Sequence, residues 1–210
     1  DMEGSRGLGD VYKRQPLGSV YAHLMHSAGV DVSMLARGNR LGALREEGLV
    51  VVNEMTGERG VSRVNVVSEI GPEDAYDLVV VLIRRNKLLP VFETLGNCPG
   101  VANILFMGNN ASGFEDYVRH LPSEKLLFGF PGAGGGFQGQ EVHYADREQP
   151  RGKRRAVTVG EMDGRTKDRT LAVRDLFEGA GVPVEMTDDI DGWLKYHVAL
   201  VSPFVGALYQ

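Results

Sequence analysis

Two glycine-containing segments near the start of the chain have the residue types that bind phosphate. The first, Gly7-Leu8-Gly9, has no apolar strand before it and no helix pattern directly after it, which argues against a phosphate loop. In the second, Gly18-Ser19, Gly18 opens an amphipathic helix pattern, and a helix N-terminus offers free N–H groups and partial positive charge to a pyrophosphate. Gly18 and Ser19 are therefore the candidate phosphate-binding residues. Lys13 and Gln15 stand where a dinucleotide fingerprint has glycines, so an ordinary helix start remains an alternative.

The segment Leu35–Arg40 follows the next expected strand, at the position where dinucleotide-binding proteins distinguish NAD from NADP. A site for NAD usually has Asp or Glu about 20 residues after its glycine loop, whereas an arginine there accommodates the 2′-phosphate of NADP. This segment contains two arginines, Arg37 and Arg40, and no carboxylate. If a dinucleotide binds, the sequence predicts NADPH; a solvated loop is the alternative.

Short β-branched runs alternate with helical patterns along the rest of the chain, which predicts an α/β fold with a parallel sheet. The run 78–83 is apolar throughout and is typical of a strand buried on both faces. We expect 141–145 and 156–160 to be antiparallel strands around the basic loop 151–155. The predicted strands are 32–36, 49–53, 61–67, 78–83, 103–107, 126–130, 141–145, 156–160 and 182–186; the predicted helices are 18–29, 40–47, 86–95, 114–120, 166–180 and one from about 191 onward.

Both ends of the chain depart from this pattern. Residues 1–15 lack the apolar strand that should precede a phosphate loop, so we expect them to be a leader foreign to the fold. The last helix, for which Asp188, Asp189 or Asp191 is the expected cap, has little sequence beyond it to pack against.

Composition excludes several classes of protein. The 210 residues are 42% hydrophobic and 24% charged, which suits a folded domain rather than a disordered chain. No apolar run approaches the roughly 20 residues that span a bilayer, and the first residues lack the pattern of a secretory signal, so we expect neither a membrane span nor a secretory leader. The single Cys98 favours the reducing cytoplasm, and the histidines have no metal-ligand spacing. A net charge of −5 argues against nucleic acid as a partner.

Six short motifs follow one another along the chain: Gly18–Ala22, Leu35–Gly38, Asp77–Val81, Leu105–Asn110, Gly129–Gly135 and Trp193–Lys195. In this order they resemble the ketopantoate reductase (2-dehydropantoate 2-reductase) family over about residues 16–210. The resemblance implies a Rossmann-type doubly wound, mainly parallel NADPH domain over 16–188, and it implies that 189–210 is the first helix of a truncated all-helical second domain. The implied activity is reduction of a small 2-keto acid to the 2-hydroxy acid, in pantothenate biosynthesis, by a parent protein of which this chain is an inactive fragment.

The resemblance also assigns cofactor contacts. Arg37 matches the family's 2′-phosphate arginine, and Arg84 stands where the family usually has a cofactor-contacting lysine. Asn109 lies close to the cofactor-binding asparagine, with a register uncertain by one because Asn110 follows it. Gly135 falls in the loop that closes over the nicotinamide side.

Lys195 matches the family's catalytic lysine, which would stabilise and protonate the alkoxide that hydride transfer creates. Ala199 and Ser202 replace asparagines that contact the keto acid in the family, which leaves the substrate open. The family's substrate-binding carboxylate lies in the helical domain, beyond Gln210. A nucleotide-sensing domain that keeps the fold without the chemistry is the rival interpretation. Whether a homodimer forms is not decided by the sequence.

Overall fold

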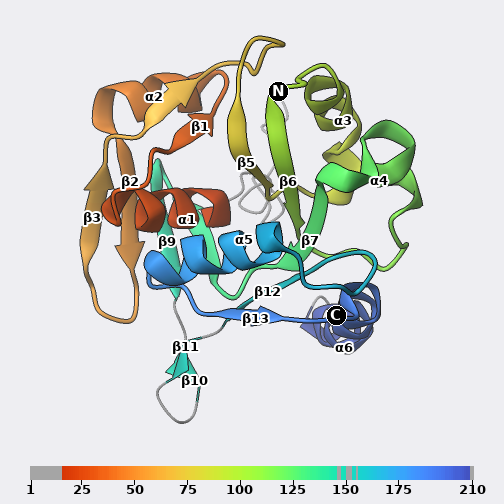
Figure 1. Ribbon diagram of the computed structural model, residues 1–210. Coiled ribbons are helices and arrows are strands. Elements are labelled where there is room, and N and C mark those ends of the chain that lie inside the picture. The colour runs from red at the N-terminus through yellow and green to blue at the C-terminus, as the bar shows by residue number, and fades with distance from the viewer. Residues whose placement is uncertain (1–15, 146–147, 150–152, 155, 209–210) are drawn as a thin grey trace, which may run out of the picture. The chain divides into compact units, whose positions relative to one another are not determined.

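The computed structural model describes residues 16–145, 148–149, 153–154 and 156–208 (Figure 1). The chain divides into two compact units. Unit 1 comprises Asp1–Ser68 and Ala133–Arg155, and unit 2 comprises Glu69–Gly132 and Ala156–Gln210. Helices and mixed or parallel sheets alternate along the chain, so the predicted α/β class is confirmed. The expected leader, residues 1–15, lies outside the described residues.

Unit 1 is built on a four-stranded sheet with the order β3-β2-β9-β8. Strand β2 pairs antiparallel with β3 and parallel with β9, and β9 pairs antiparallel with β8. A separate parallel pair joins β1 to β4. Helix α1 packs on all four strands of the larger sheet. The elements are α1 Pro16–Ser27, β1 Ser33–Leu35, α2 Asn39–Glu47, β2 Leu49–Asn53, β3 Arg59–Ser62, β4 Asn65–Val67, β8 Gly134–Gln138 and β9 Glu141–Ala145, with a short antiparallel pair β10 Glu148–Gln149 and β11 Lys153–Arg154.

Unit 2 is built on a five-stranded sheet with the order β13-β12-β7-β6-β5. Strands β5, β6 and β7 are parallel, β12 is antiparallel to β7, and β13 is parallel to β12. The elements are β5 Tyr76–Val81, α3 Leu89–Gly96, β6 Val101–Met107, α4 Glu115–His120, β7 Leu126–Phe130, β12 Val157–Gly160, α5 Asp168–Gly179, β13 Val184–Met186 and α6 Ile190–Leu208, with 3-10 helices at Arg85–Lys87 and Ser123–Lys125.

The apolar runs of the sequence become the core of unit 2. Residues 104–107 of β6 are all buried, so this strand is covered on both faces. On one face, side chains of β5–β7 join those of α3, α4 and α6 in one cluster. Edge-to-face contacts order its centre, with Tyr117 at 4.9 Å from the ring centroids of both Phe106 and Phe128. This core fixes the position of the loops that follow β5 and β6.

Some sequence predictions differ from the observed elements. Residues 141–145 and 156–160 do form strands, but their pairing with each other was wrong: β9 pairs with β2 and β8, whereas β12 pairs with β7 and β13. Strand β9 belongs to the sheet of unit 1, and β12 belongs to the sheet of unit 2. The sequence could not reveal this, because pairing between strands far apart in the chain has no local sequence signal. The run 61–67 is divided into β3 and β4, and β8 occupies part of the glycine-rich segment that was expected to be a loop.

The last helix begins as predicted, and the structure selects its cap. Asp189 precedes α6, and its Oδ1 accepts a hydrogen bond at 2.8 Å from the backbone N–H of Gly192. This contact satisfies one of the free N–H groups of the first turn. In the described part of the chain, no helix is long and apolar enough to cross a membrane.

Candidate functional site

The candidate phosphate-binding residues lie in the first turn of α1. Helix α1 begins at Pro16, which has no N–H group to donate, and Gly18 and Ser19 follow within that turn. No acidic side chain lies in this turn, so within the turn nothing neutralises the partial positive charge of the helix end. Ser19 is buried, whereas Gly18 is partly exposed, so the backbone of Gly18 is the more accessible of the two to a phosphate.

Arg37 lies just beyond the carboxyl end of β1, on the surface of unit 1. Its Nε donates a hydrogen bond at 3.3 Å to the backbone carbonyl of Ser68, which follows the paired strand β4. The other arginine of this segment, Arg40, is occupied elsewhere: its Nη1 donates at 2.7 Å to the Gln140 carbonyl, and its guanidinium lies 5.0 Å from the Phe137 ring centroid. Arg37 is therefore the arginine of this segment that is exposed and able to face a phosphate.

Gly135 lies within strand β8, opposite Tyr144, rather than in a loop. A Cβ atom at Gly135 would lie 2.7 Å from the backbone oxygen of His143, closer than real Cβ atoms come. The need for glycine at this position thus has a structural cause, the close approach of β8 and β9. This placement in a strand differs from the loop that the resemblance implied.

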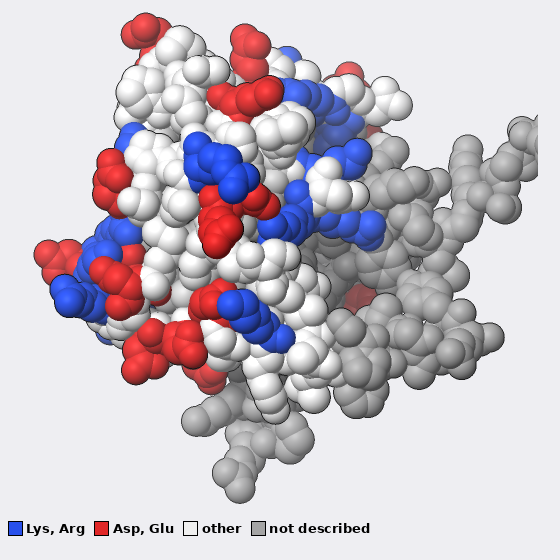
Figure 2. All heavy atoms as spheres, turned by 90° about the vertical axis from the view of Figure 1, so that its right-hand side faces the viewer, with Lys and Arg blue, Asp and Glu red and all other residues white. Residues whose placement is uncertain are grey.

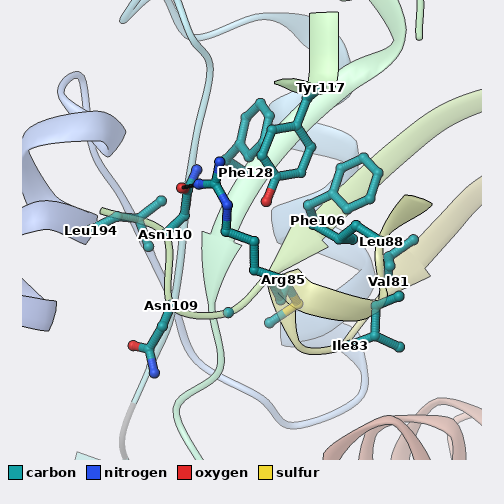
Figure 3. A pocket seen from close by; sticks show the side chains of 12 residues that line it. Val81, Ile83, Arg85, Leu88, Phe106, Asn109, Asn110, Tyr117, Phe128 and Leu194 are labelled. Atoms are coloured by element: carbon teal, nitrogen blue, oxygen red, sulfur yellow. Dashed lines mark hydrogen bonds between the residues drawn. The ribbon is translucent and has the colours of Figure 1, made fainter. Parts of the chain in front are cut away.

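A pocket lies at the carboxyl ends of β5 and β6 in unit 2 (Figure 3). Val81 and Phe106 face each other in the register of these parallel strands, so the loops that follow the two strands emerge side by side. Open α/β sheets bind ligands at this edge. The lining is mostly apolar with a few polar groups, and consists of Val81, Ile83, Arg85, Leu88, Phe106, Met107, Gly108, Asn109, Asn110, Tyr117, Phe128 and Leu194.

The two asparagines of the pocket differ in accessibility, although they are neighbours in sequence. Asn109 is exposed, whereas Asn110 is only 4% exposed. In Figure 3 their side chains point to opposite sides of the loop, with Asn110 directed toward Arg85. Asn110 is used internally, since its Oδ1 accepts from Arg85 and its Nδ2 donates to the Gly113 carbonyl. Asn109 is the amide that remains accessible to a ligand.

Arg84, Arg85 and Tyr117 contribute the remaining polar groups at this end of unit 2. Arg84 follows β5 by three residues and is exposed, directly before the 3-10 helix Arg85–Lys87. Arg85 donates at 2.5 Å to Asp116. Burial raises the pKa of the Tyr117 hydroxyl, so this group is a neutral donor near pH 7. Sequence reasoning missed Arg85, whose only signal is that it is a second cation beside Arg84, and it named Asn110 only as the alternative register for Asn109.

Lys195 lies on α6 beside the pocket rather than in its lining. Its Nζ forms an ion pair with Asp191, one turn earlier on the helix, and about half of its side chain is exposed. The preceding residue, Leu194, lines the pocket and is buried. The Trp193 indole stacks on the His197 ring, with centroids 5.2 Å apart and planes 7° apart, and both contact Phe130 at the end of β7. Lys195 is thus held on an anchored helix next to the Asn109 loop.

The candidate residues therefore form two sets, one in each unit. Gly18, Ser19, Arg37 and Gly135 belong to unit 1, and Arg84, Asn109, Lys195 and Ser202 belong to unit 2. Ser202 lies two turns beyond Lys195 on α6. Within unit 2, the structure brings Arg84 and Asn109 to the same edge of the sheet, with Lys195 on the adjacent helix.

The charged side chains do not form a large patch of one sign on the face shown in Figure 2. Lysine and arginine side chains alternate there with aspartate and glutamate side chains among the described atoms. The ion pairs of Asp116 with both Arg85 and Arg119 are an example of this alternation in unit 2. Among the described residues, no group of three or more His, Cys, Asp or Glu side chains could hold a metal ion.

The chain is similar to known reductases over most of its length. A curated 2-dehydropantoate 2-reductase from Archaeoglobus fulgidus is 29% identical over 191 residues, which are 89% of this chain and 59% of that protein. The chain thus spans about three fifths of the length of this relative. The sequence profile described as "Ketopantoate reductase PanE/ApbA" matches residues 16–163.

Solved structures agree with this similarity at the level of the fold. The 2-dehydropantoate 2-reductase from Porphyromonas gingivalis W83 superposes with a TM-score of 0.76 at 20% identity, over 89% of this chain and 66% of that chain. A D-mandelate dehydrogenase bound to NADH and anilino(oxo)acetate superposes with a TM-score of 0.66 at 19% identity, over 83% of this chain and 55% of that chain. Because the family profile covers more than half of the chain, the chain belongs to the ketopantoate reductase family.

Proposed function

We propose that the chain is the cofactor-binding part of an NADPH-dependent cytoplasmic reductase that converts a small 2-keto acid, similar to 2-dehydropantoate, into the 2-hydroxy acid. The observation that carries the choice of NADPH is Arg37, an exposed guanidinium at the carboxyl end of β1 in a segment without carboxylates. A planar guanidinium can bind a phosphate through two parallel hydrogen bonds. Family membership supports the reaction class.

Each unit offers donors that suit a nucleotide. Within unit 1, the N-terminal turn of α1 suits a pyrophosphate and Arg37 suits the 2′-phosphate of NADP. Within unit 2, the exposed amide of Asn109 suits the ribose or carboxamide of a nicotinamide nucleotide. Arg84, exposed beside the same edge, adds positive charge. The bound cofactor would supply the hydride, and the residues of this chain would bind and orient it.

Lys195 is proposed to act on the substrate. A ketone that accepts a hydride develops negative charge on its oxygen, and an ammonium group can stabilise this charge and then donate a proton. Half of the Lys195 side chain is exposed, and the ion pair with Asp191 holds its amine near the start of α6. Ser202, farther along α6, is the proposed substrate residue at the position of the family's asparagine. The identity of the keto acid would also depend on the part of the relatives that this chain does not span.

The second candidate function is a nucleotide-binding or nucleotide-sensing domain without catalysis. Two observations favour it: Ser19 is buried, and Ala199 and Ser202 stand where the family resemblance expects amides that contact the substrate. Two measurements separate the candidates. Cofactor binding with loss of NADPH absorbance on addition of keto acids supports the reductase, whereas binding without turnover in a version extended to the length of its relatives supports the sensor.

A further inference from the structure

A buried amide organises the loop that follows β6. The Oδ1 atom of Asn110 accepts two hydrogen bonds, from Arg85 Nη1 at 2.7 Å and from the backbone N–H of Ser112 at 3.2 Å. Its Nδ2 donates to the Gly113 carbonyl at 2.8 Å. Because Asn110 is 4% exposed, these bonds are shielded from water, and losing one partner would leave a buried polar group unsatisfied.

Arg85 extends this network to two further segments. It begins the 3-10 helix Arg85–Lys87 after β5, and its Nη2 donates at 2.5 Å to Asp116 in the first turn of α4. One guanidinium therefore joins the segment after β5, the loop after β6 and the start of α4. A lysine could satisfy one of these acceptors but could not reproduce the planar fork that reaches both.

The network determines how Asn109 is presented. Asn109 and Asn110 are adjacent, so fixing the Asn110 side chain on one side of the loop directs Asn109 to the other side (Figure 3). The pairing with Asp116 neutralises much of the Arg85 charge, which makes Arg85 poorly suited to bind an anion itself. Its two hydrogen bonds, to Asn110 and to Asp116, instead hold the loop after β6 against the start of α4.

We propose that Arg85 is a positioning residue: through Asn110 it holds the 108–113 loop in the conformation that presents Asn109, and this sets the affinity for the nicotinamide cofactor. The proposal rests on the proposed function, since it assumes that Asn109 contacts the cofactor. Preorganising a loop in its bound conformation raises affinity by removing the cost of ordering it.

The test uses the 210-residue chain and the variants Arg85→Lys, Arg85→Ala and Arg119→Ala. Arg119 also pairs with Asp116 but has no contact with Asn110, so Arg119→Ala is the matched control for loss of that ion pair. NADPH affinity is measured by isothermal titration calorimetry, and amide hydrogen exchange of residues 108–113 is measured without cofactor. Arg85→Lys keeps the charge and the pairing with Asp116, which guards against a variant that fails to fold.

We expect Arg85→Lys and Arg85→Ala to weaken NADPH binding by about tenfold and to speed exchange in the 108–113 loop, with Arg119→Ala unchanged in both. Full affinity in Arg85→Lys together with a loss in Arg85→Ala would overturn the proposal, because charge alone would then suffice. Unchanged affinity despite faster exchange would overturn it as well. Failure of the unmodified chain to bind NADPH or NADH would instead overturn the proposed function, and the proposal with it.

Discussion

Arg37 Nε donates a hydrogen bond to the backbone carbonyl of Ser68 at 3.3 Å, across the carboxyl ends of the parallel strands β1 and β4. The contact uses Nε and orients the exposed guanidinium at the edge where open α/β sheets bind their ligands. In the proposed function, the choice of NADPH rests mainly on this side chain.

Replacing Arg37 with alanine should weaken NADPH binding by about 1–3 kcal/mol and leave NADH binding nearly unchanged, because only NADPH carries the 2′-phosphate. Calorimetric titration of each cofactor measures both effects. Arg45→Ala is the matched control, since Arg45 is also exposed and donates to a nearby carbonyl, that of Val66. Equal losses for both cofactors would contradict the role of Arg37.

Lys195→Ala should lower turnover by about a hundredfold or more in a version extended to the length of its relatives, with little change in NADPH affinity. A positioned general acid contributes roughly 10²–10⁴ in rate, because the charge on the substrate oxygen develops only in the transition state. Lys195→Arg should also be slow, since a guanidinium does not readily release a proton near neutral pH. Steady-state kinetics measure the turnover of both variants. Undiminished turnover in the alanine variant would contradict the role of Lys195 as the proton donor.

Gly135→Ala should destabilise unit 1 by about 1–3 kcal/mol, because the added Cβ would lie 2.7 Å from the His143 backbone oxygen. Gly134→Ala is the matched control: Gly134 is in the same strand, but a Cβ there would have no atom within 4 Å. Denaturant unfolding without cofactor compares the two. If Gly135→Ala keeps full stability and loses only NADPH affinity, the glycine serves the cofactor rather than the packing of β8 on β9.

The surroundings of the Glu161 carboxyl group predict that the free energy of unfolding depends on pH. Burial would raise the pKa of this carboxyl, but hydrogen bonds from Arg169 and Thr170, with the charges of Arg169 and Lys167, hold the pKa below its usual value. The carboxylate therefore stabilises the fold above about pH 4.3, the ordinary glutamate pKa, and this contribution is lost as the pH falls through the lowered value.

Glu161→Gln should accordingly lower the free energy of unfolding at pH 7 by about 3 kcal/mol, because it leaves the 16%-exposed Arg169 without its carboxylate. The difference from the unmodified chain should shrink below about pH 4. Denaturant unfolding as a function of pH measures both. Glu178→Gln, at an exposed carboxylate of α5, should change stability by less than about 0.5 kcal/mol, and an equal effect of the two substitutions would refute the account.

Most elements of the fold could be predicted from sequence because their apolar periodicity is local. Strand β6 and helix α6 are examples. An aspartate cap for α6 could also be predicted from residue type, but the choice of Asp189 over Asp188 and Asp191 comes from the structure. Strand β8 could not be predicted, because Gly134-Gly135-Gly136 has no apolar pattern, and the reason for glycine at Gly135 is a backbone 8 residues away in β9.

Some residues of the candidate site could likewise be predicted from the sequence, whereas the roles of others depend on the folded structure. Arg37 could be found from its distance along the chain from Gly18, since the lengths of α1 and β1 fix where β1 ends. The roles of Asn109 and Asn110 could not be distinguished, because burial of Asn110 depends on Arg85 and Gly113, and only the folded loop brings these groups together. The assignment of residues 1–15 as a leader stays a prediction.

The most direct test of the central claim is a calorimetric titration of the unmodified 210-residue chain with NADPH and, separately, with NADH. The account predicts that NADPH binds at least about tenfold more tightly, equivalent to roughly 1.4 kcal/mol, through contacts that include Arg37. Equal affinity for the two cofactors, tighter binding of NADH, or no binding of either would contradict it.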